Sequence, residues 1–241
     1  MTKAATATEA GIKVYTCKRC GGTRMEIVPA AVPAKNGKGS AKETERIILL
    51  VKSNRDVSGS SFSGIRARAL KMTESGITVQ WNRVSGANRY VVYGAKCRIG
   101  SRYRKLKTTS GTSYRQTKLR KGTYYKYMVV AIDPDGRTKA VSKVVYAVTS
   151  GGKYGNYKAV KVSKPKITLK KGKSVKLKAA GVKADKKRKV RICRKIAFES
   201  ANPKIVTVSS SGTVRAKAKG RTTIYCYAQN GVYRAVQAKA E

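Results

Sequence analysis

Cysteine has the most reactive side chain in this sequence, which contains five Cys and no His. Cys17 and Cys20 are separated by two residues, the spacing that lets two thiolates face one metal ion, as in half of a zinc knuckle. The second half of such a site is missing, because no other pair of Cys is close in sequence. A metal site, a disulfide or structural role, and a reactive thiol therefore all stay open for this pair.

The other three cysteines are Cys97, Cys193 and Cys226. Cys193 stands in a basic segment and Cys226 in an expected strand of the same module, so a disulfide between them is compatible with the sequence. The alternative is that both are small buried apolar residues. Because the Cys count is odd and low for a disulfide scaffold, we expect apolar cores to hold the fold together.

The sequence offers few groups for catalysis. It has 11 Asp and Glu, and it contains neither a nucleophile-elbow motif nor a phosphate-binding loop. Asp133 and Asp135 stand in DPDG, where Asp is common turn chemistry and cation binding is the alternative. We predict no catalytic residues, no cofactor and no enzyme activity.

Positive charge dominates the composition: 55 Lys and Arg against 11 Asp and Glu give a net charge of +44. Most cations must therefore face water or an anion from another molecule. Residues 151–240 contain 25 Lys and Arg against two acids, and the densest run is KADKKRKVRICRK around Lys186. Anionic wall polymers, acidic glycans and nucleic acid are the candidate partners, although no individual binding residue can be identified and no nucleic-acid fold signature is visible.

The sequence lacks a run of 18 apolar residues, so we expect no membrane span. Its beginning, MTKAATATEAG, lacks the apolar run of a signal peptide. We therefore expect either a cytoplasmic protein or an internal piece of an exported one.

Short segments with period-two alternation, separated by turn residues, begin near Ser63 and predict an all-β chain. GITVQW places Ile77, Val79 and Trp81 on one face of a strand. The prediction is two tandem immunoglobulin-like β-sandwiches preceded by a Cys-containing segment and a linker. The expected bounds are 1–30 for the Cys-containing segment, 31–62 for the linker, 63–149 for the first sandwich, 150–158 for a spacer and 159–241 for the second sandwich.

The first module resembles a fibronectin type III domain over about residues 63–149. Trp81 followed by SGANRYVVY and then LRKGTYYKYMVVA carries the resemblance. It implies that Trp81 fills the centre of the core and that Tyr125 is the tyrosine corner. Independently, alternation in this segment places Tyr125, Tyr127, Val129 and Ala131 on one side of a strand. Lys121 stands where the family often has Pro.

The second module resembles the bacterial immunoglobulin-like group 2 domain over about residues 159–240. An aromatic residue before SAN, then IVTV, then SGTVRAKAKG and a Thr-Ile-Tyr strand carry this resemblance. It implies a core with Phe198, Ile205, Val208 and Val214 and turns at two glycines, Gly212 and Gly220. The basic insertion KADKKRKVRICRK is longer than the family pattern.

This tandem is similar to a pairing in large modular surface proteins of Gram-positive anaerobes. The Cys17–Cys20 segment likewise resembles a small repeat of such proteins, in which a further Cys usually stands where Ala7 is. The resemblance implies export to an extracellular, cell-wall location. We expect a monomeric, non-catalytic structural or adhesive module. The alternatives are an intracellular polyanion binder and an accessory domain of a secreted hydrolase.

Overall fold

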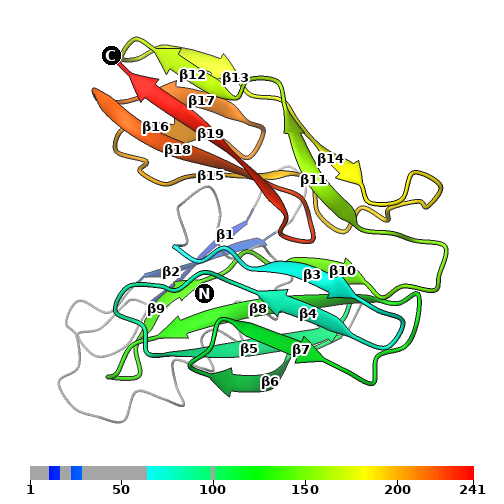
Figure 1. Ribbon diagram of the computed structural model, residues 1–241. Coiled ribbons are helices and arrows are strands. Elements are labelled where there is room, and N and C mark those ends of the chain that lie inside the picture. Colours follow the sequence, from blue (N-terminus) through cyan, green and yellow to red (C-terminus); the bar gives the residue numbers. More distant parts are fainter. Residues whose placement is uncertain (1–10, 17–22, 29–63, 99–100) are drawn as a thin grey trace. The chain divides into compact units, whose positions relative to one another are not determined.

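A computed structural model describes residues 11–16, 23–28, 64–98 and 101–241, and it is shown in Figure 1. The regular elements in these ranges are β-strands, which confirms the all-β prediction. None of the described residues forms a helix long and apolar enough to span a membrane. Cys17, Cys20 and the predicted linker at 31–62 lie outside the described residues.

The chain divides into two compact units, residues 1–39 and residues 40–241. In the first unit, β1 (Gly11–Thr16) pairs antiparallel with β2 (Thr23–Val28). Both sandwiches belong to the second unit.

The first sandwich consists of two antiparallel sheets, drawn in cyan to green in Figure 1. One sheet has the order β3 (Arg68–Met72), β4 (Ile77–Gln80) and β7 (Ser113–Gln116). The other has the order β10 (Val145–Val148), β8 (Tyr124–Ile132), β5 (Arg89–Lys96) and β6 (Arg104–Thr109), with β9 (Thr138–Val141) also paired to β8.

The core of this sandwich lies between the two sheets. Ile77, Val79 and Trp81 are buried there, as their alternation predicts. The Tyr125 hydroxyl accepts a hydrogen bond from the Arg120 amide at 3.1 Å, so the tyrosine ties its strand to the preceding loop as the resemblance implies.

Strand β8 is buried on both faces, whereas the sequence indicated one buried side. Tyr127 and Val129 lie in the core between the sheets. Met128 and Val130 belong to a second buried cluster, with Val91 and Tyr93 of β5 completing it. The continuous apolar run YMVVA is the sequence feature that corresponds to this double burial.

The second sandwich, drawn in yellow-green to red, contains one four-stranded and two smaller sheets. The four-stranded order is β12 (Lys166–Leu169), β19 (Tyr233–Ala240), β18 (Gly220–Tyr227) and β15 (Ala197–Ser200). The three-stranded order is β13 (Ser174–Lys176), β17 (Thr213–Ala216) and β16 (Val206–Val208). The remaining pair is β11 (Tyr157–Val162) with β14 (Ala179–Lys183).

The core of the second sandwich contains the predicted Phe198, Val208 and Val214, all buried, while Ile205 is partly buried against them. The strands β12 and β13 flank a turn at Gly172, but they join different sheets: β12 pairs parallel with β19, and β13 pairs antiparallel with β17. The turn at Gly172 therefore carries the chain from one layer to the other.

Candidate functional site

Residues 229–231, at the tip of the turn between β18 and β19, contact the first sandwich; we call them the junction turn. The Asn230 carbonyl accepts a hydrogen bond from the amide of Ala69 in β3 at 2.9 Å. The Gln229 carbonyl accepts one from the amide of Tyr146 in β10 at 2.8 Å. Because β3 and β10 are edge strands of the two sheets of the first sandwich, the junction turn satisfies a donor on each.

Gly231 allows this close approach. Its φ is +83°, a conformation that side chains other than glycine rarely adopt. A Cβ at Gly231 would overlap the carbonyl oxygen of Ala67 and lie 2.6 Å from Arg68 Cα. Any other residue at position 231 would therefore push the junction turn away from β3.

The Gln229 side chain, which is 2% exposed, fixes the segment between β14 and β15, residues 184–196, called here the basic loop. Gln229 Oε1 accepts a hydrogen bond from the Cys193 amide at 2.8 Å, and Nε2 donates one to the Arg191 carbonyl at 2.9 Å. Arg194 Nη2 donates to the Ala228 carbonyl at 3.1 Å. One buried amide side chain thus joins the junction turn to the basic loop.

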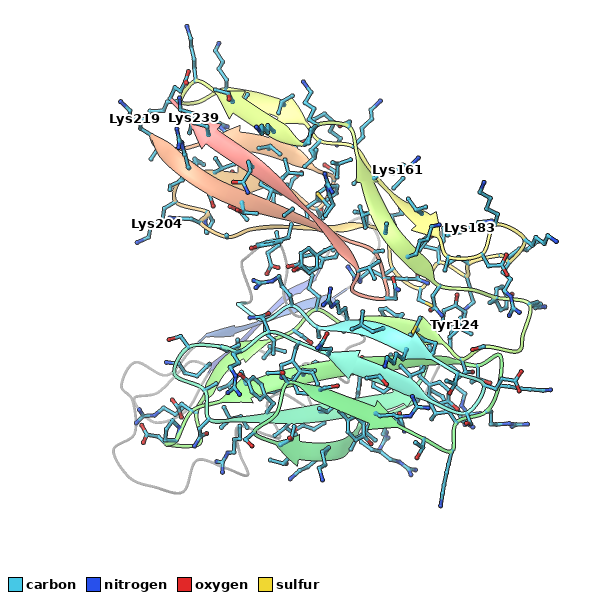
Figure 2. All side chains as sticks on the ribbon, in the orientation of Figure 1. Tyr124, Lys161, Lys183, Lys204, Lys219 and Lys239 are labelled. Carbon is cyan, nitrogen blue, oxygen red and sulfur yellow. The ribbon has the colours of Figure 1, made fainter. Side chains whose placement is uncertain are left out.

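Tyr124, labelled in Figure 2, connects the first sandwich to the basic loop. Its hydroxyl accepts a hydrogen bond from the Arg191 amide and donates one to the Gly155 carbonyl, each at 3.2 Å. The Arg191 guanidinium lies 4.9 Å from the centre of the Tyr124 ring, within cation–π range. Burial raises the pKa of the Tyr124 hydroxyl to about 12, so it stays protonated and can donate.

The predicted spacer, residues 150–158, is bonded on both sides. The Asn156 side chain pairs with the backbone of Val148, accepting from its amide at 3.0 Å and donating to its carbonyl at 2.8 Å. On the other side, Arg188 Nη1 of the basic loop donates to the Gly152 carbonyl at 2.6 Å. These bonds leave the spacer little freedom as a hinge.

Two half-buried cysteines from different sandwiches meet at the junction. The Sγ atoms of Cys97, which follows β5, and Cys193, in the basic loop, are 3.6 Å apart. Cys226 instead is fully buried in the core of the second sandwich, which is the small-apolar role that the sequence offered as an alternative. The neighbour of Cys193 is therefore Cys97 and not Cys226, with which the sequence left a disulfide open as one of two possibilities.

Two tyrosine rings of the second sandwich, one of them bonded to a buried acid, lie near cations of the first. Glu199 is fully buried, and its Oε2 accepts a hydrogen bond from the Tyr227 hydroxyl at 2.8 Å. Lys143 Nζ lies 5.9 Å from the centre of the Tyr227 ring, and the Arg66 guanidinium lies 5.0 Å from that of Tyr225. Aromatic rings of one sandwich thus face cations of the other, an attractive arrangement.

The remaining candidates from the sequence lie at the surface, with Asp133 partly buried and Asp135 exposed. Asp133 Oδ1 accepts from the Arg137 amide at 2.7 Å, and Asp135 pairs with the Arg137 guanidinium at 3.2 Å, so both acids hold the turn that contains them. Lys186 is exposed in the basic loop. Figure 2 shows further exposed lysines directed away from the second sandwich; those labelled are Lys161, Lys183, Lys204, Lys219 and Lys239.

The sequence did not reveal the junction residues. Asn230-Gly231 is a typical hairpin turn signal, and it does close β18 onto β19, but its carbonyls also serve the first sandwich. The sequence of the basic loop indicates a solvated run of charges. In the structure, however, the Arg188 and Arg191 guanidinium groups donate hydrogen bonds to backbone carbonyls at the junction. Both contacts depend on which edges of the two sandwiches meet, and no local sequence pattern predicts which edges these are.

Two solved structures similar to part of this chain are a fibronectin type III domain and a Fn3-like protein. One is from the human fibronectin type III domain containing protein 3, with 23% identity, 38% of this chain and 88% of the other covered, and a TM-score of 0.32. The other is a Fn3-like protein from Clostridium thermocellum, with 26% identity, 35% and 88% covered, and a TM-score of 0.31. No curated protein matches the chain.

A family model matches the second sandwich. The match covers residues 157–238, and its description is the bacterial Ig-like domain, group 2. It agrees with the resemblance carried by Phe198, Val208 and Val214. Residues 157–238 of this chain are therefore a bacterial Ig-like domain of group 2.

Proposed function

We propose that this chain is a non-catalytic structural segment of a bacterial cell-surface or secreted protein, in which the two sandwiches act as one stiff unit that projects other domains. The family match supports this role, because bacterial Ig-like domains are commonly extracellular structural modules. A stiff unit transmits position and force along a modular protein, whereas freely hinged domains do not.

The junction turn is the observation that carries the proposal. Neighbouring domains usually move relative to each other unless their interface is extensive. Here two backbone hydrogen bonds, from Ala69 and Tyr146, run from the edges of the first sandwich to the turn. Gln229 and Asn230 are 2% and 1% exposed, so this contact excludes water. Burial makes each of these polar contacts costly to break.

Backbone ¹⁵N relaxation by NMR tests the stiffness. We expect the amides of both sandwiches to report one common rotational correlation time. Gly231→Ala, which places a Cβ against Ala67 and Arg68, should give each sandwich its own, shorter correlation time.

Gly172→Ala is the matched control for that experiment. Gly172 has the same φ of +83°, but a Cβ there meets nothing within 4 Å. It therefore carries the same backbone strain without the clash and should leave the common correlation time unchanged. Separate tumbling in the unmodified protein, or identical behaviour of the two variants, would contradict the proposal.

A second, independent part of the proposal is that the cationic surface lies against an anionic polymer. The exposed lysines labelled on the second sandwich in Figure 2 supply a charge that the two acids of residues 151–240 cannot balance. Each contact would be weak, and repetition of modules would raise the overall affinity. Anionic wall polymers and acidic glycans are the partners that fit an extracellular structural segment.

Retention on immobilised wall polymer, acidic mucin glycan and duplex DNA, each titrated with salt, tests this part. We expect retention on wall polymer or mucin at physiological salt, and weaker retention of the variant Lys186→Glu/Lys187→Glu. Lys71→Glu/Lys105→Glu, a change of equal charge at exposed lysines of the first sandwich, is the control. Equal release from all three polymers below physiological salt would show that the charge attracts polyanions without selectivity.

A further inference from the structure

Cys97 and Cys193 are placed next to each other by two different sandwiches. Their Sγ atoms are 3.6 Å apart although the residues are 96 positions apart in sequence. The backbone on each side is anchored: the Cys97 amide donates to the Tyr124 carbonyl at 2.8 Å, and the Cys193 amide donates to Gln229 Oε1 at 2.8 Å. A disulfide bond of about 2.05 Å would require the two sulfurs to approach by about 1.5 Å, a distance within the reach of side-chain rotation.

The surroundings favour a thiolate on Cys97. Hydrogen bonding with Cys193 is the largest effect, and together with the charges of Arg191 and Lys126 it lowers the pKa of the Cys97 thiol to about 6 against the opposing effect of burial. Arg191 Nη2 also donates to the Cys97 carbonyl at 2.8 Å, which keeps the guanidinium at this site. A thiolate is the form of cysteine that attacks disulfides.

Both cysteines are only half-buried, so a small molecule can reach them. Cys226, by contrast, is fully buried in the core of the second sandwich. Burial raises the pKa of the Cys226 thiol to about 12, which makes it a poor nucleophile. Among the described cysteines, Cys97 is thus the accessible thiol with a lowered pKa. Hydrogen bonding to Cys97 is the largest cause that raises the pKa of the Cys193 thiol, and this cause ends once the Cys97 sulfur is part of a disulfide.

We propose that Cys97 and Cys193 form a disulfide that covalently joins the two sandwiches, with a low-molecular-weight disulfide as the oxidant. The Cys97 thiolate attacks one sulfur of that disulfide, giving a mixed disulfide and releasing the first small thiol. Cys193 then loses its proton and attacks the Cys97 sulfur, giving the protein disulfide and releasing the second small thiol. Two protein thiols are oxidised, and one small disulfide is reduced to two thiols.

The bond would join the two sandwiches covalently at the junction. It would close a loop of 96 positions between the modules, and long loops are those for which a cross-link restricts the unfolded chain most. The inference rests on the same junction as the proposed stiff unit. The test below detects which sulfurs are paired and does not measure domain motion. The disulfide and the stiff unit can therefore be contradicted separately.

The test is oxidation of the full chain under native conditions with oxidised glutathione as the probe. Remaining thiols are blocked by alkylation, and a digest is analysed by mass spectrometry. We expect peptides that link Cys97 to Cys193 to predominate, and Cys226 to be alkylated only after unfolding. Oxidation should raise Tm by at least about 5 °C relative to Cys97→Ser/Cys193→Ser treated in the same way.

Single variants make the result specific. Cys193→Ser should abolish both the linked peptide and the rise in Tm, whereas Cys226→Ser should retain both. Recovery of Cys97 and Cys193 as alkylated thiols after oxidation would overturn the proposal. A predominant pairing of Cys193 with any other cysteine would also overturn it, as would equal formation of the Cys97–Cys193 link in chain unfolded by urea.

Discussion

At the scale of single residues, stability depends on polar groups that are buried and bonded. Asn156, Gln229 and Glu199 are each less than 9% exposed, and each has a hydrogen-bonded partner. A buried polar group that loses its partner costs about 1–3 kcal/mol, comparable to a large part of the stability of a small domain. Changes at such residues are therefore the most informative tests at this scale.

The hydroxyl of Tyr125 provides one such test. Tyr125→Phe removes the acceptor for the Arg120 amide, which should lower the free energy of unfolding by about 1–3 kcal/mol in urea titrations. Tyr114→Phe is the control. Burial raises the pKa of the Tyr114 hydroxyl without a contribution from a hydrogen bond, and the ring packs at the edge of the same core. This variant therefore removes a tyrosine hydroxyl without removing such a bond. An equal loss in the two variants would count against a specific role for the Tyr125 bond.

Buried tyrosines predict a loss of stability at alkaline pH. Burial raises the pKa of Tyr124 to about 12 and that of Tyr127 and Tyr227 further still, while the unfolded chain ionises near pH 10. The unfolded state therefore binds fewer protons above pH 10, so the free energy of unfolding falls as pH rises. The slope is about 1.4 kcal/mol per pH unit for each such hydroxyl.

Urea titrations between pH 9 and 11.5 measure this slope. Tyr227→Phe should reduce the slope of the free energy of unfolding against pH by the contribution of one hydroxyl. This holds whatever the variant does to the free energy of unfolding at pH 9. A free energy of unfolding that stays constant from pH 10 to 11.5 would contradict the account.

At the scale of elements, turns decide how the strands enter the sandwiches. Gly212, between β16 and β17, has a φ of +86°. A Cβ there would overlap the carbonyl oxygen of Leu177, in the connection between β13 and β14. This turn thus needs glycine for both conformation and space. The turn at Gly172 needs it for conformation alone, since its surroundings are open.

Gly212→Ala should accordingly destabilise the chain more than Gly172→Ala. In both variants the left-handed backbone lowers the free energy of unfolding by about 1 kcal/mol. Only Gly212→Ala adds an overlap with backbone atoms and the Phe198 ring. We expect a difference of at least about 1 kcal/mol in the free energy of unfolding, measured by urea titration. Equal losses would mean that the second sandwich can shift to accommodate the added methyl group.

These elements also show what the sequence could predict. Alternation in GITVQW identified the buried side of β4, because burial on one face leaves a period of two. The same reasoning described β8 as one-sided, because alternation cannot show that a second buried cluster forms over Met128 and Val130. The glycine at 212 was expected at a turn, since positive φ favours glycine in any context.

The candidate site was much less predictable. Cys97 and Cys193 are 96 positions apart and come together only because the junction turn docks on β3 and β10. That docking depends on the shapes of two finished sandwiches, and composition, spacing and periodicity describe each strand alone. The sequence therefore predicted the two modules but not the contact between them.

At the scale of the whole molecule, the central claim is that the two sandwiches of residues 40–241 behave as one unit. The sandwiches have separate apolar cores, so each could unfold alone if the junction were weak. The backbone bonds of the junction turn and the contacts of Gln229 and Tyr124 oppose this separation. Unfolding of one sandwich would leave these buried partners of the other without their bonds.

Equilibrium unfolding in urea with one probe in each sandwich tests the claim most directly. Trp81 is the single Trp of the chain and lies in the core of the first sandwich, so its fluorescence reports that sandwich alone. Pulsed hydrogen–deuterium exchange of β18 and β19 reports the second. We predict that the two transitions share one midpoint. A range of urea concentrations in which one probe reports the unfolded state and the other the folded state would contradict it.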